Sequence, residues 1–226
     1  MINKSEREQI IALINREVVP AIGCTEPIAV ALCVAKATET LGCKPEKIQA
    51  LLSANILKNA MGVGIPGTGM SGLPIAIALG ALSGKSEYQL EVLKDSTPEA
   101  VEEGKKLIDS QAINIGLKYG IEEKLYIEII CEAEGKKATA IISGGHTHFV
   151  YVACDDEVLL NEQGNTSSES ASDDVELTLR KVYDFAMESP IDELKFILET
   201  RNLNKKAAER SFKGNYGHQL GKTLNS

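Results

Sequence analysis

The chain has 226 residues, a formal net charge of −8 and a pI near 5.1, and its basic residues are scattered. The length allows a sizeable core in one large domain or two small ones, and the acidic balance argues against nucleic acid or an anionic membrane as a partner. The first residues are polar, and the richest apolar run is broken by Gly and Pro, so neither a signal peptide nor a membrane span is expected. We therefore expect a soluble, cytoplasmic protein.

The N-terminal part of the chain predicts mainly helices. Ser5 and Glu8 form a candidate capping box for the first helix, and a second helix is expected from Thr25 to Gly42. The run KIQALLSANILKNAM that follows is ambiguous, because its Ile and Leu spacing suits a helix while its serine could cap a new one.

The middle of the chain changes to strand-like patterns. YQLEVLK at 88–94 predicts a strand, and Thr97 with Pro98 predicts the start of a helix. The runs KLYIEIICEAE and KKATAIISG alternate apolar and polar residues around a Gly-containing turn at 134–136, which predicts a hairpin. The runs HTHFVYVACDD and EVLLN are expected to continue this sheet.

These patterns predict an α+β fold in three blocks. Residues 1–85 and 172–226 are expected to form a helical, catalytic-type domain whose last helix ends at Gly214. Residues 86–162 are expected to form an inserted α/β subdomain with an antiparallel sheet. The polar run NEQGNTSSESASDD at 161–174 predicts a flexible connector.

The stretch AIGCTEP at 21–27 places Cys24 directly in front of a helix start. Thr25 can cap that helix, and the exposed N–H groups and helix dipole at this end favour a thiolate, the reactive and metal-binding form of cysteine. The alternative is a small buried residue at a turn. Glu26 is either an acid that complements the dipole or a catalytic group. The five cysteines form no CxxC pair, so neither a disulfide framework nor a zinc ribbon is expected.

A glycine-rich loop, MGVGIPGTGMSGLP, follows the ambiguous run. Such a loop lets backbone N–H groups approach an anion, although it is neither a Walker A sequence nor a dinucleotide fingerprint. Lys58, Asn59 and Thr68 supply a cation, an amide and a hydroxyl, a combination that suits a carboxylate. A plain structural turn with a solvated lysine is the alternative.

The run GGHTHFV contains two of the three histidines. His146 and His148 alternate along an expected strand, so their side chains would share one face. A His-x-His pair can bind a metal, but the sequence shows no evident third ligand nearby.

Three segments together carry a resemblance: AIGCTEPIAVAL, SANILKNAMGVGIPGTGMSGLPIAIALGAL and SGGHTHFV. They resemble the L-cysteine desulfidase family, whose members are often named serine dehydratase-like alpha-chain proteins. The resemblance runs through nearly the whole chain in the right order. It implies a lyase of amino-acid catabolism that converts L-cysteine to pyruvate, ammonia and sulfide with a 4Fe–4S cluster, one iron of which acts as a Lewis acid on sulfur.

The resemblance also implies residue roles. Cys24 would be a cluster ligand or lie beside the cluster, the glycine loop would hold the substrate carboxylate, and the histidine run would contact substrate or assist proton transfer. The candidate catalytic residues are Cys24, Glu26, Lys58 and His146, of which Glu26 is a candidate only because it lies near Cys24 in the sequence. The implied substrate-binding residues are Thr25, Asn59, Gly67, Thr68, Gly69, Thr147 and His148.

The chain departs from the family pattern in one respect. Family members are longer, and their further cluster cysteines lie in a C-terminal half that does not follow here. We expect this chain to be an amino-terminal fragment, a proteolysed product or half of a split protein. Its cluster site would be incomplete and its own activity small, and a homo-oligomeric partner or missing half would cover apolar surface. Two alternatives remain: an L-serine dehydratase, and a non-catalytic module that binds an amino acid or small anion.

Overall fold

The computed structural model describes residues 2–162, 175–215 and 219–225. The α+β class is confirmed, because helices accompany a six-stranded sheet and a small two-stranded ribbon. Most of the predicted connector at 161–174 lies outside the described residues. In the described part of the chain, no helix is long and apolar enough to cross a membrane.

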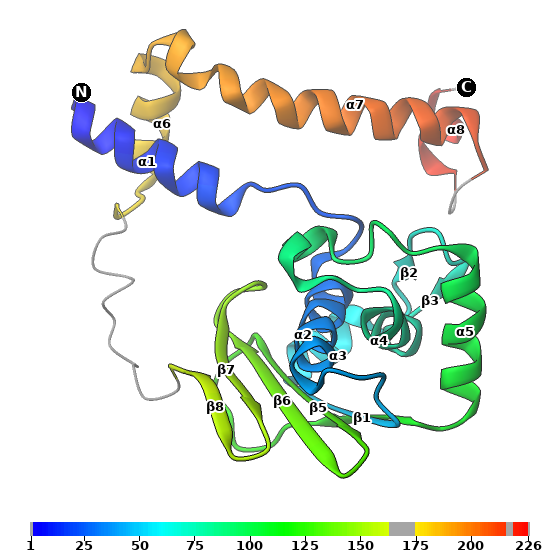
Figure 1. Ribbon diagram of the computed structural model, residues 1–226. Helices are drawn as coiled ribbons and strands as arrows, with labels where there is room; N and C mark the ends of the chain where they lie inside the picture. The colour runs from blue at the N-terminus through cyan, green and yellow to red at the C-terminus, as the bar shows by residue number, and fades with distance from the viewer. Residues whose placement is uncertain (1, 163–174, 216–218, 226) are drawn as a thin grey trace. The chain divides into compact units, whose positions relative to one another are not determined.

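The chain divides into two units, which we describe separately (Figure 1). The sheet unit is Val19–Ser167, and the helical unit combines Met1–Val18 with Ser168–Ser226. This division differs from the predicted one at residue 85. The ambiguous run contains a strand that lies inside the six-stranded sheet, between two strands from the 86–162 block, so both blocks share one sheet.

The main sheet has the strand order β4-β1-β5-β6-β7-β8, in which β1 pairs with β4 in parallel and all other pairs are antiparallel. The β5–β6 hairpin is confirmed, with Glu134 and Gly135 at positive φ in its turn. The strands of the main sheet are β1 (Lys47–Leu52), β4 (Ile113–Leu117), β5 (Tyr126–Ala133), β6 (Lys136–Ser143), β7 (Phe149–Cys154) and β8 (Glu157–Asn161).

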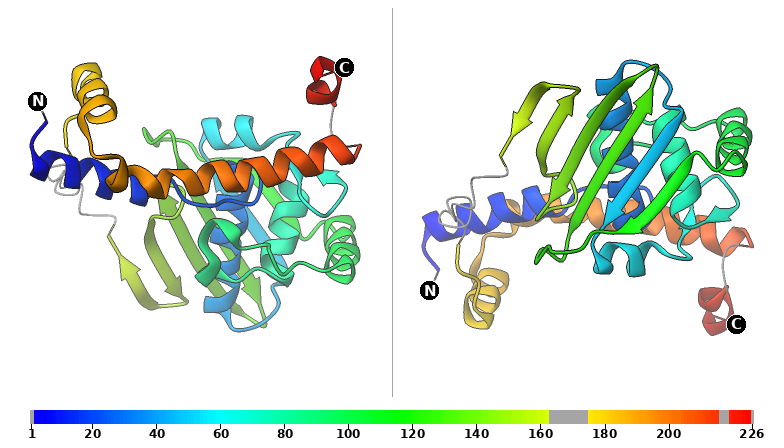
Figure 2. Two further views of the ribbon diagram at one scale, coloured as in Figure 1. Left: turned by 90° about the horizontal axis from the view of Figure 1, so that it is seen from above. Right: turned by 90° about the horizontal axis from the view of Figure 1, so that it is seen from below.

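The helices of the sheet unit lie on one face of this sheet, as both views of Figure 2 show. Helix α2 packs on β5 and β6, α4 packs on α2, and α5 packs on α4. Alternate residues of β1 and β5 are buried on the helix side, which is the period expected of strands covered on one face. The helices are α2 (Thr25–Leu41), α3 (Ala54–Ala60), α4 (Leu73–Leu82) and α5 (Pro98–Asp109), with a 3-10 segment η1 at Ser86–Glu91.

The segment predicted as a strand at 88–94 is not one. It continues η1 into turns, and the chain kinks at Gln89, whose φ of 50° lies in the left-handed region. Leu90 and Val92 are buried against the core that contains α2. An irregular segment that packs on a helix can alternate apolar and polar residues as a strand does, and this is why the sequence pattern predicted a strand here.

Helices α2 and α4 run in the same direction and approach very closely. A Cβ atom added at Gly80 would lie 2.6 Å from the carbonyl oxygen of Ala31, and one added at Gly84 would lie 2.9 Å from the Cβ of Ala35. Because the contacts advance by four residues on both segments, their N-terminal ends lie at the same end of the unit. Residues before Thr25 and before Leu73 are thereby brought together.

The helical unit has a small core of its own, centred on Ile2, Ile10 and Phe185. The first helix is capped by a box at Asn3 and Glu6, not by the predicted Ser5 and Glu8, so it begins two residues earlier than expected. Its elements are α1 (Lys4–Glu17), α6 (Leu179–Glu188), a 3-10 segment η2 (Ile191–Ile197), α7 (Leu198–Lys213) and α8 (Leu220–Asn225).

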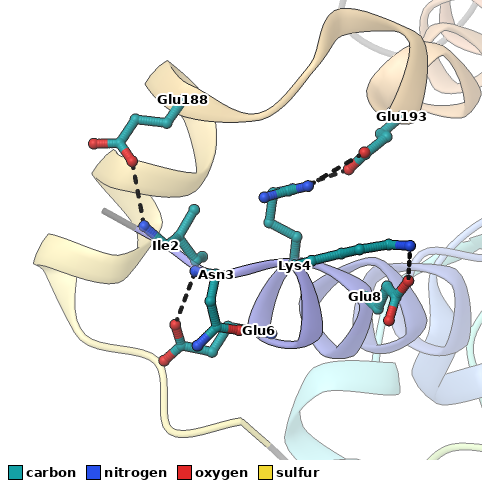
Figure 3. Close-up of polar contacts among 8 residues, drawn as sticks. Ile2, Asn3, Lys4, Glu6, Glu8, Glu188 and Glu193 are labelled. Atoms are coloured by element: carbon teal, nitrogen blue, oxygen red, sulfur yellow. Dashed lines mark hydrogen bonds and ion pairs between the residues drawn. The ribbon is translucent and has the colours of Figure 1, made fainter.

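Polar contacts join α1 to the C-terminal helices of this unit (Figure 3). The backbone N–H of Ile2 donates to Glu188 at 3.2 Å, and the Arg7 guanidinium pairs with Glu193 at 3.0 Å. The predicted end of the last long helix at Gly214 is confirmed, since Gly214 caps α7.

Candidate functional site

The N-terminus of α2 forms the centre of the candidate site. Gly23 has a φ of +87°, Cys24 is the N-cap residue, and the helix begins at Thr25, with Glu26 in its first turn. Thr25 was predicted as the cap, but Cys24 holds the cap position and Thr25 is the first residue of the helix. The Cys24 side chain makes no capping hydrogen bond to the helix backbone. Its sulfur is therefore available to a different partner.

That partner is the Glu26 carboxylate. The Cys24 Sγ donates to Glu26 Oε2 at 2.9 Å, and the Thr25 hydroxyl donates to the same oxygen at 3.4 Å. The other oxygen, Oε1, accepts a hydrogen bond from Asn59 Nδ2 at 3.2 Å. All four side chains are half-buried. The site thus contains an oriented carboxylate whose two oxygens have different donors.

The ionisation of this pair is opposite to the one predicted for the cysteine. Burial and the hydrogen bond to Glu26 raise the pKa of the Cys24 thiol above its ordinary value. The hydrogen bonds from Cys24 and Asn59, together with the nearby His146 imidazole, lower the pKa of Glu26. The raised pKa argues against the predicted thiolate: burial of the sulfur first, and its hydrogen bond to the Glu26 carboxylate second, oppose the partial positive charge of the helix end. The site holds a thiol and an ionised carboxylate.

The glycine loop folds into a short ribbon of β2 (Gly64–Ile65) and β3 (Met70–Ser71). The Thr68 hydroxyl donates to the Ile65 carbonyl at 2.7 Å and accepts from the Met70 N–H at 2.9 Å, so it fastens the turn. Gly67 and Gly69, both exposed with positive φ, complete that turn. The expectation that Thr68 offers a free hydroxyl to a substrate is not met, because its donor and acceptor capacity serve the turn.

This ribbon lies directly against the cysteine turn. A Cβ atom added at Gly23 would lie 3.0 Å from Cγ of Pro66, the first residue of the ribbon's turn. The backbone N–H of Ile22 also donates to the Leu90 carbonyl at 3.2 Å, which ties the cysteine turn to the segment after η1. Two separate loops thus support the residues in front of α2.

Lys58 and Asn59 are neighbours in α3, but they have different environments. Asn59 is half-buried and bonded to Glu26, whereas Lys58 is exposed and makes no polar contact within the described residues. The predicted roles therefore separate: the amide belongs to the carboxylate network, and the lysine remains as a solvated cation on the same short helix.

The histidine run forms a turn and not a strand. β7 begins at Phe149, and His146 and Thr147 lie in the turn before it. His148 contacts the Ser143 carbonyl at 3.0 Å through Nδ1 and Glu162 at 3.3 Å through Nε2. His146 is half-buried and influences Glu26 electrostatically. The predicted strand is therefore wrong at these two residues, because both precede β7.

The cysteines do not provide the donor set of a 4Fe–4S cluster. Cys33 and Cys131 are fully buried in the main core, as expected for Cys33 from its apolar helix. Cys43 follows the far end of α2, about 26 Å from Cys24 for a helix of 17 residues. Cys154 lies at the end of β7. Among the described residues, no three His, Cys, Asp or Glu side chains form a group that could hold a metal ion. A cluster needs several thiolates, so these residues do not fit it.

Sequence reasoning singled out three segments, and the structure brings them together at one end of α2. Sequence reasoning did not predict that Gly23 lies against Pro66 or that the Leu90 carbonyl accepts a hydrogen bond from Ile22. The local signal for the first contact was the glycine before Cys24, a residue type that readily adopts positive φ. The prediction that Asn59 binds substrate stays a prediction; in the structure its amide donates to the Glu26 carboxylate.

Comparisons with known proteins found relatives that share one printed name. The chain is 78% identical over 226 residues to a UPF0597 protein of Phocaeicola vulgatus, which covers all of this chain and 52% of that relative. It is 76% identical over 221 residues to the UPF0597 protein BF3560 of Bacteroides fragilis, covering 98% of this chain and 52% of the relative. A UPF0597 protein of Porphyromonas gingivalis is 46% identical over 226 residues, again with 52% of the relative covered.

No family model matches the chain, and no solved structure matches it significantly. The printed names of the relatives state no activity. The chain is therefore similar to UPF0597 proteins and spans about half the length of the relatives it matches.

Proposed function

We propose that this chain supplies the substrate-binding part of a lyase for a small amino acid, with L-cysteine as the first candidate. In the proposed reaction L-cysteine loses its α-proton and a hydrosulfide ion, and the resulting aminoacrylate reacts with water to give pyruvate and ammonia. The observation that carries the proposal is the meeting of the cysteine turn, the glycine ribbon and the histidine turn around an ionised, oriented Glu26.

Glu26 is suited to bind the substrate ammonium. Its lowered pKa keeps it charged, and hydrogen bonds to charged partners are stronger than neutral ones. The same lowered pKa makes it a weak proton acceptor, so it is a poor choice for removing the α-proton. Lys58, exposed beside Asn59, is the cation available for the substrate carboxylate.

His146 is the proton acceptor in this proposal. The neutral form of an imidazole can accept a proton, and His146 lies close enough to Glu26 for its protonated form to lower the pKa of that carboxyl group. The C–S bond then breaks with its electron pair on sulfur. Cys24 has no covalent role in this scheme, because its thiol is protonated and donates to Glu26.

The implied iron–sulfur cluster is not used in these steps. Cys24 is the one cysteine near Glu26, and the other four lie in the core or at distant positions. Any cluster that served this reaction would require thiolates from outside the chain. L-Serine, which differs in its leaving group, remains an alternative substrate for the same site.

A second candidate is a binding module without catalysis. It is favoured by the positions of the cysteines, which do not provide the ligands of a 4Fe–4S cluster. Glu26 and Lys58 would bind the ammonium and carboxylate of any small amino acid, with no reaction to follow. L-Alanine, which has no leaving group, should then bind as well as L-cysteine does.

The proposal is tested by anaerobic calorimetry with L-cysteine, L-alanine and 3-mercaptopropionate, which lacks the ammonium. We expect both amino acids to bind and 3-mercaptopropionate to bind at least about tenfold more weakly, since one charge-assisted hydrogen bond contributes about 1.5–3 kcal/mol. Glu26→Gln should abolish this difference, and the exposed Glu157→Gln on β8 is the matched control. Equal binding of all three compounds would exclude Glu26 as the ammonium site.

Turnover is tested separately by measuring sulfide and pyruvate with this chain and with a longer protein that carries it, each reconstituted anaerobically with iron and sulfide. Sulfide release by the longer form that is lost in His146→Ala supports the lyase. Binding without product in either form supports the module.

A further inference from the structure

The Glu26 carboxylate receives a separate donor on each oxygen. Oε2 accepts from Cys24 at 2.9 Å and from Thr25 at 3.4 Å, both on the same turn as Glu26 itself. Oε1 accepts from Asn59 at 3.2 Å, a residue 33 positions away on another helix. Local contacts therefore hold one oxygen, and the only tertiary contact among these hydrogen bonds holds the other. Asn59 is the group that decides how the carboxylate plane is turned.

Helix α3 is well placed to serve as a rigid support for that contact. At its start the buried Ser53 hydroxyl donates to the Lys124 carbonyl at 2.7 Å and accepts from the N–H groups of Ile56 and Tyr126. Ile56 and Ala60, four residues apart, are both buried and fix the rotation of the helix. A helix of seven residues is only about 10 Å long, so Asn59 lies close to the anchored end of the helix and can move little relative to it.

We propose that Asn59 is a positioning residue that orients the Glu26 carboxylate, and through it the Cys24 thiol, instead of contacting substrate. A carboxylate has only acceptors, so the amide nitrogen of Asn59 is the group that must face it. This inference deepens the proposed function, because it states how the ammonium-binding carboxylate is presented. The alternative is that Asn59 binds substrate directly and meets Glu26 incidentally.

A spectroscopic test addresses the positioning without any substrate. The S–H stretching band of Cys24, identified as the band lost in Cys24→Ser, reports the strength of its hydrogen bond to Glu26. We expect Asn59→Leu to shift this band to higher wavenumber, because a reoriented carboxylate accepts the thiol proton less well. Asn55→Leu, at an exposed asparagine on the same helix, should leave the band in place.

A double-mutant comparison shows whether Asn59 acts through Glu26. Glu26→Gln alone should shift the band, and adding Asn59→Leu to it should produce no further shift. The band unchanged in Asn59→Leu, or shifted equally in both backgrounds, would overturn the inference. Asn59→Ala provides a second variant, which lacks the donor and should shift the band in the same direction if Asn59→Leu does not fold.

L-Alanine affinity separates this inference from the proposed function. If L-alanine binds, Asn59→Leu should weaken it in the wild-type background and not in Glu26→Gln. A further loss in Glu26→Gln would show direct contact with substrate and overturn the positioning role. If L-alanine does not bind at all while the band shifts as expected, the proposed function fails and the positioning role stands.

Discussion

Replacement of Gly80 by alanine tests the close parallel packing of α2 and α4 that brings the site together. The added Cβ would lie 2.6 Å from the Ala31 carbonyl oxygen and 3.1 Å from the Ala31 Cα. Relaxed C···O contacts between helices lie near 3.3 Å, so α4 must move away from α2 by about 0.7 Å. Both obstructing atoms are backbone, and no side-chain rotation can relieve the contact.

The net cost follows from two opposing contributions. Overpacking of this kind costs up to about 3 kcal/mol, and the gain in helix propensity from Gly to Ala is about 1 kcal/mol. We therefore expect Gly80→Ala to lower the free energy of unfolding by about 2 kcal/mol. Gly104→Ala in α5 is the matched control, because it has the same propensity gain and meets the flexible Cδ1 of Ile75 at 3.1 Å. The control should be neutral or slightly stabilising.

Urea unfolding followed by far-UV circular dichroism measures both variants, and hydrogen exchange of α2 peptides assigns the loss to the sheet unit. L-Alanine affinity should fall with Gly80→Ala, since α4 carries the glycine ribbon at its N-terminal end. A Gly80→Ala protein as stable as Gly104→Ala would refute the close approach of the two backbones.

Three further outcomes follow from individual residues. Gly23→Ala should destabilise the protein more than Gly62→Ala, because both glycines have positive φ and only the first would press its Cβ against the ribbon; equal losses would mean that this contact is loose. Ser53→Ala should cost about 2 kcal/mol against about 1 kcal/mol for Thr97→Ala, since the buried cap serves three partners and the exposed cap one. Burial raises the pKa of Cys131 to about 12, so the contribution of this thiol to stability is complete below the pKa of the unfolded chain and is lost as pH rises toward 12. In urea unfolding from pH 9.5 to 11, the free energy of unfolding should fall with pH about 1.4 kcal/mol per pH unit less steeply in Cys131→Ala than in the wild type. Equal pH dependence in the two proteins would contradict this.

Local signals predicted the helices with clear boundaries. Gly42 ends α2 in the left-handed conformation, and Thr97 with Pro98 starts α5, as their residue types indicate. The β5–β6 hairpin could be predicted equally well from the sequence, because its two strands are joined by a short turn. In each case the information lies within a few residues of the feature itself.

Strand β1 could not be predicted in the same way. Its partners β4 and β5 lie more than sixty residues later in the chain, and Ile48, Ala50 and Leu52 acquire their alternating burial only in that pairing. Within the isolated segment the same apolar residues suit a helix. Tertiary pairing decided the outcome, and it also decided that residues 1–85 do not form a domain apart from the sheet.

The error at Cys24 has a different physical origin. The helix N-terminus does supply partial positive charge, but burial of the sulfur raises the pKa of the thiol, and the Glu26 carboxylate, 2.9 Å from the sulfur, raises it further. The sequence contained this carboxylate, yet its rotamer depends on Asn59, a contact that no local pattern indicates.

The chemistry of the candidate site therefore depends on the fold more than on any one motif. The cysteine turn alone predicts a thiolate, the glycine loop alone an anion site, and the histidine run alone a metal pair. Packed at the same end of two parallel helices, they instead surround a carboxylate that keeps the thiol protonated, while the hydroxyl of the loop and one histidine serve their own turns. The ionised Glu26 and the nearby His146 remain available to a ligand, and Lys58 lies exposed on α3 beside Asn59. Under the proposed function these charges would meet a small zwitterion, which is why an amino acid is the ligand to test first.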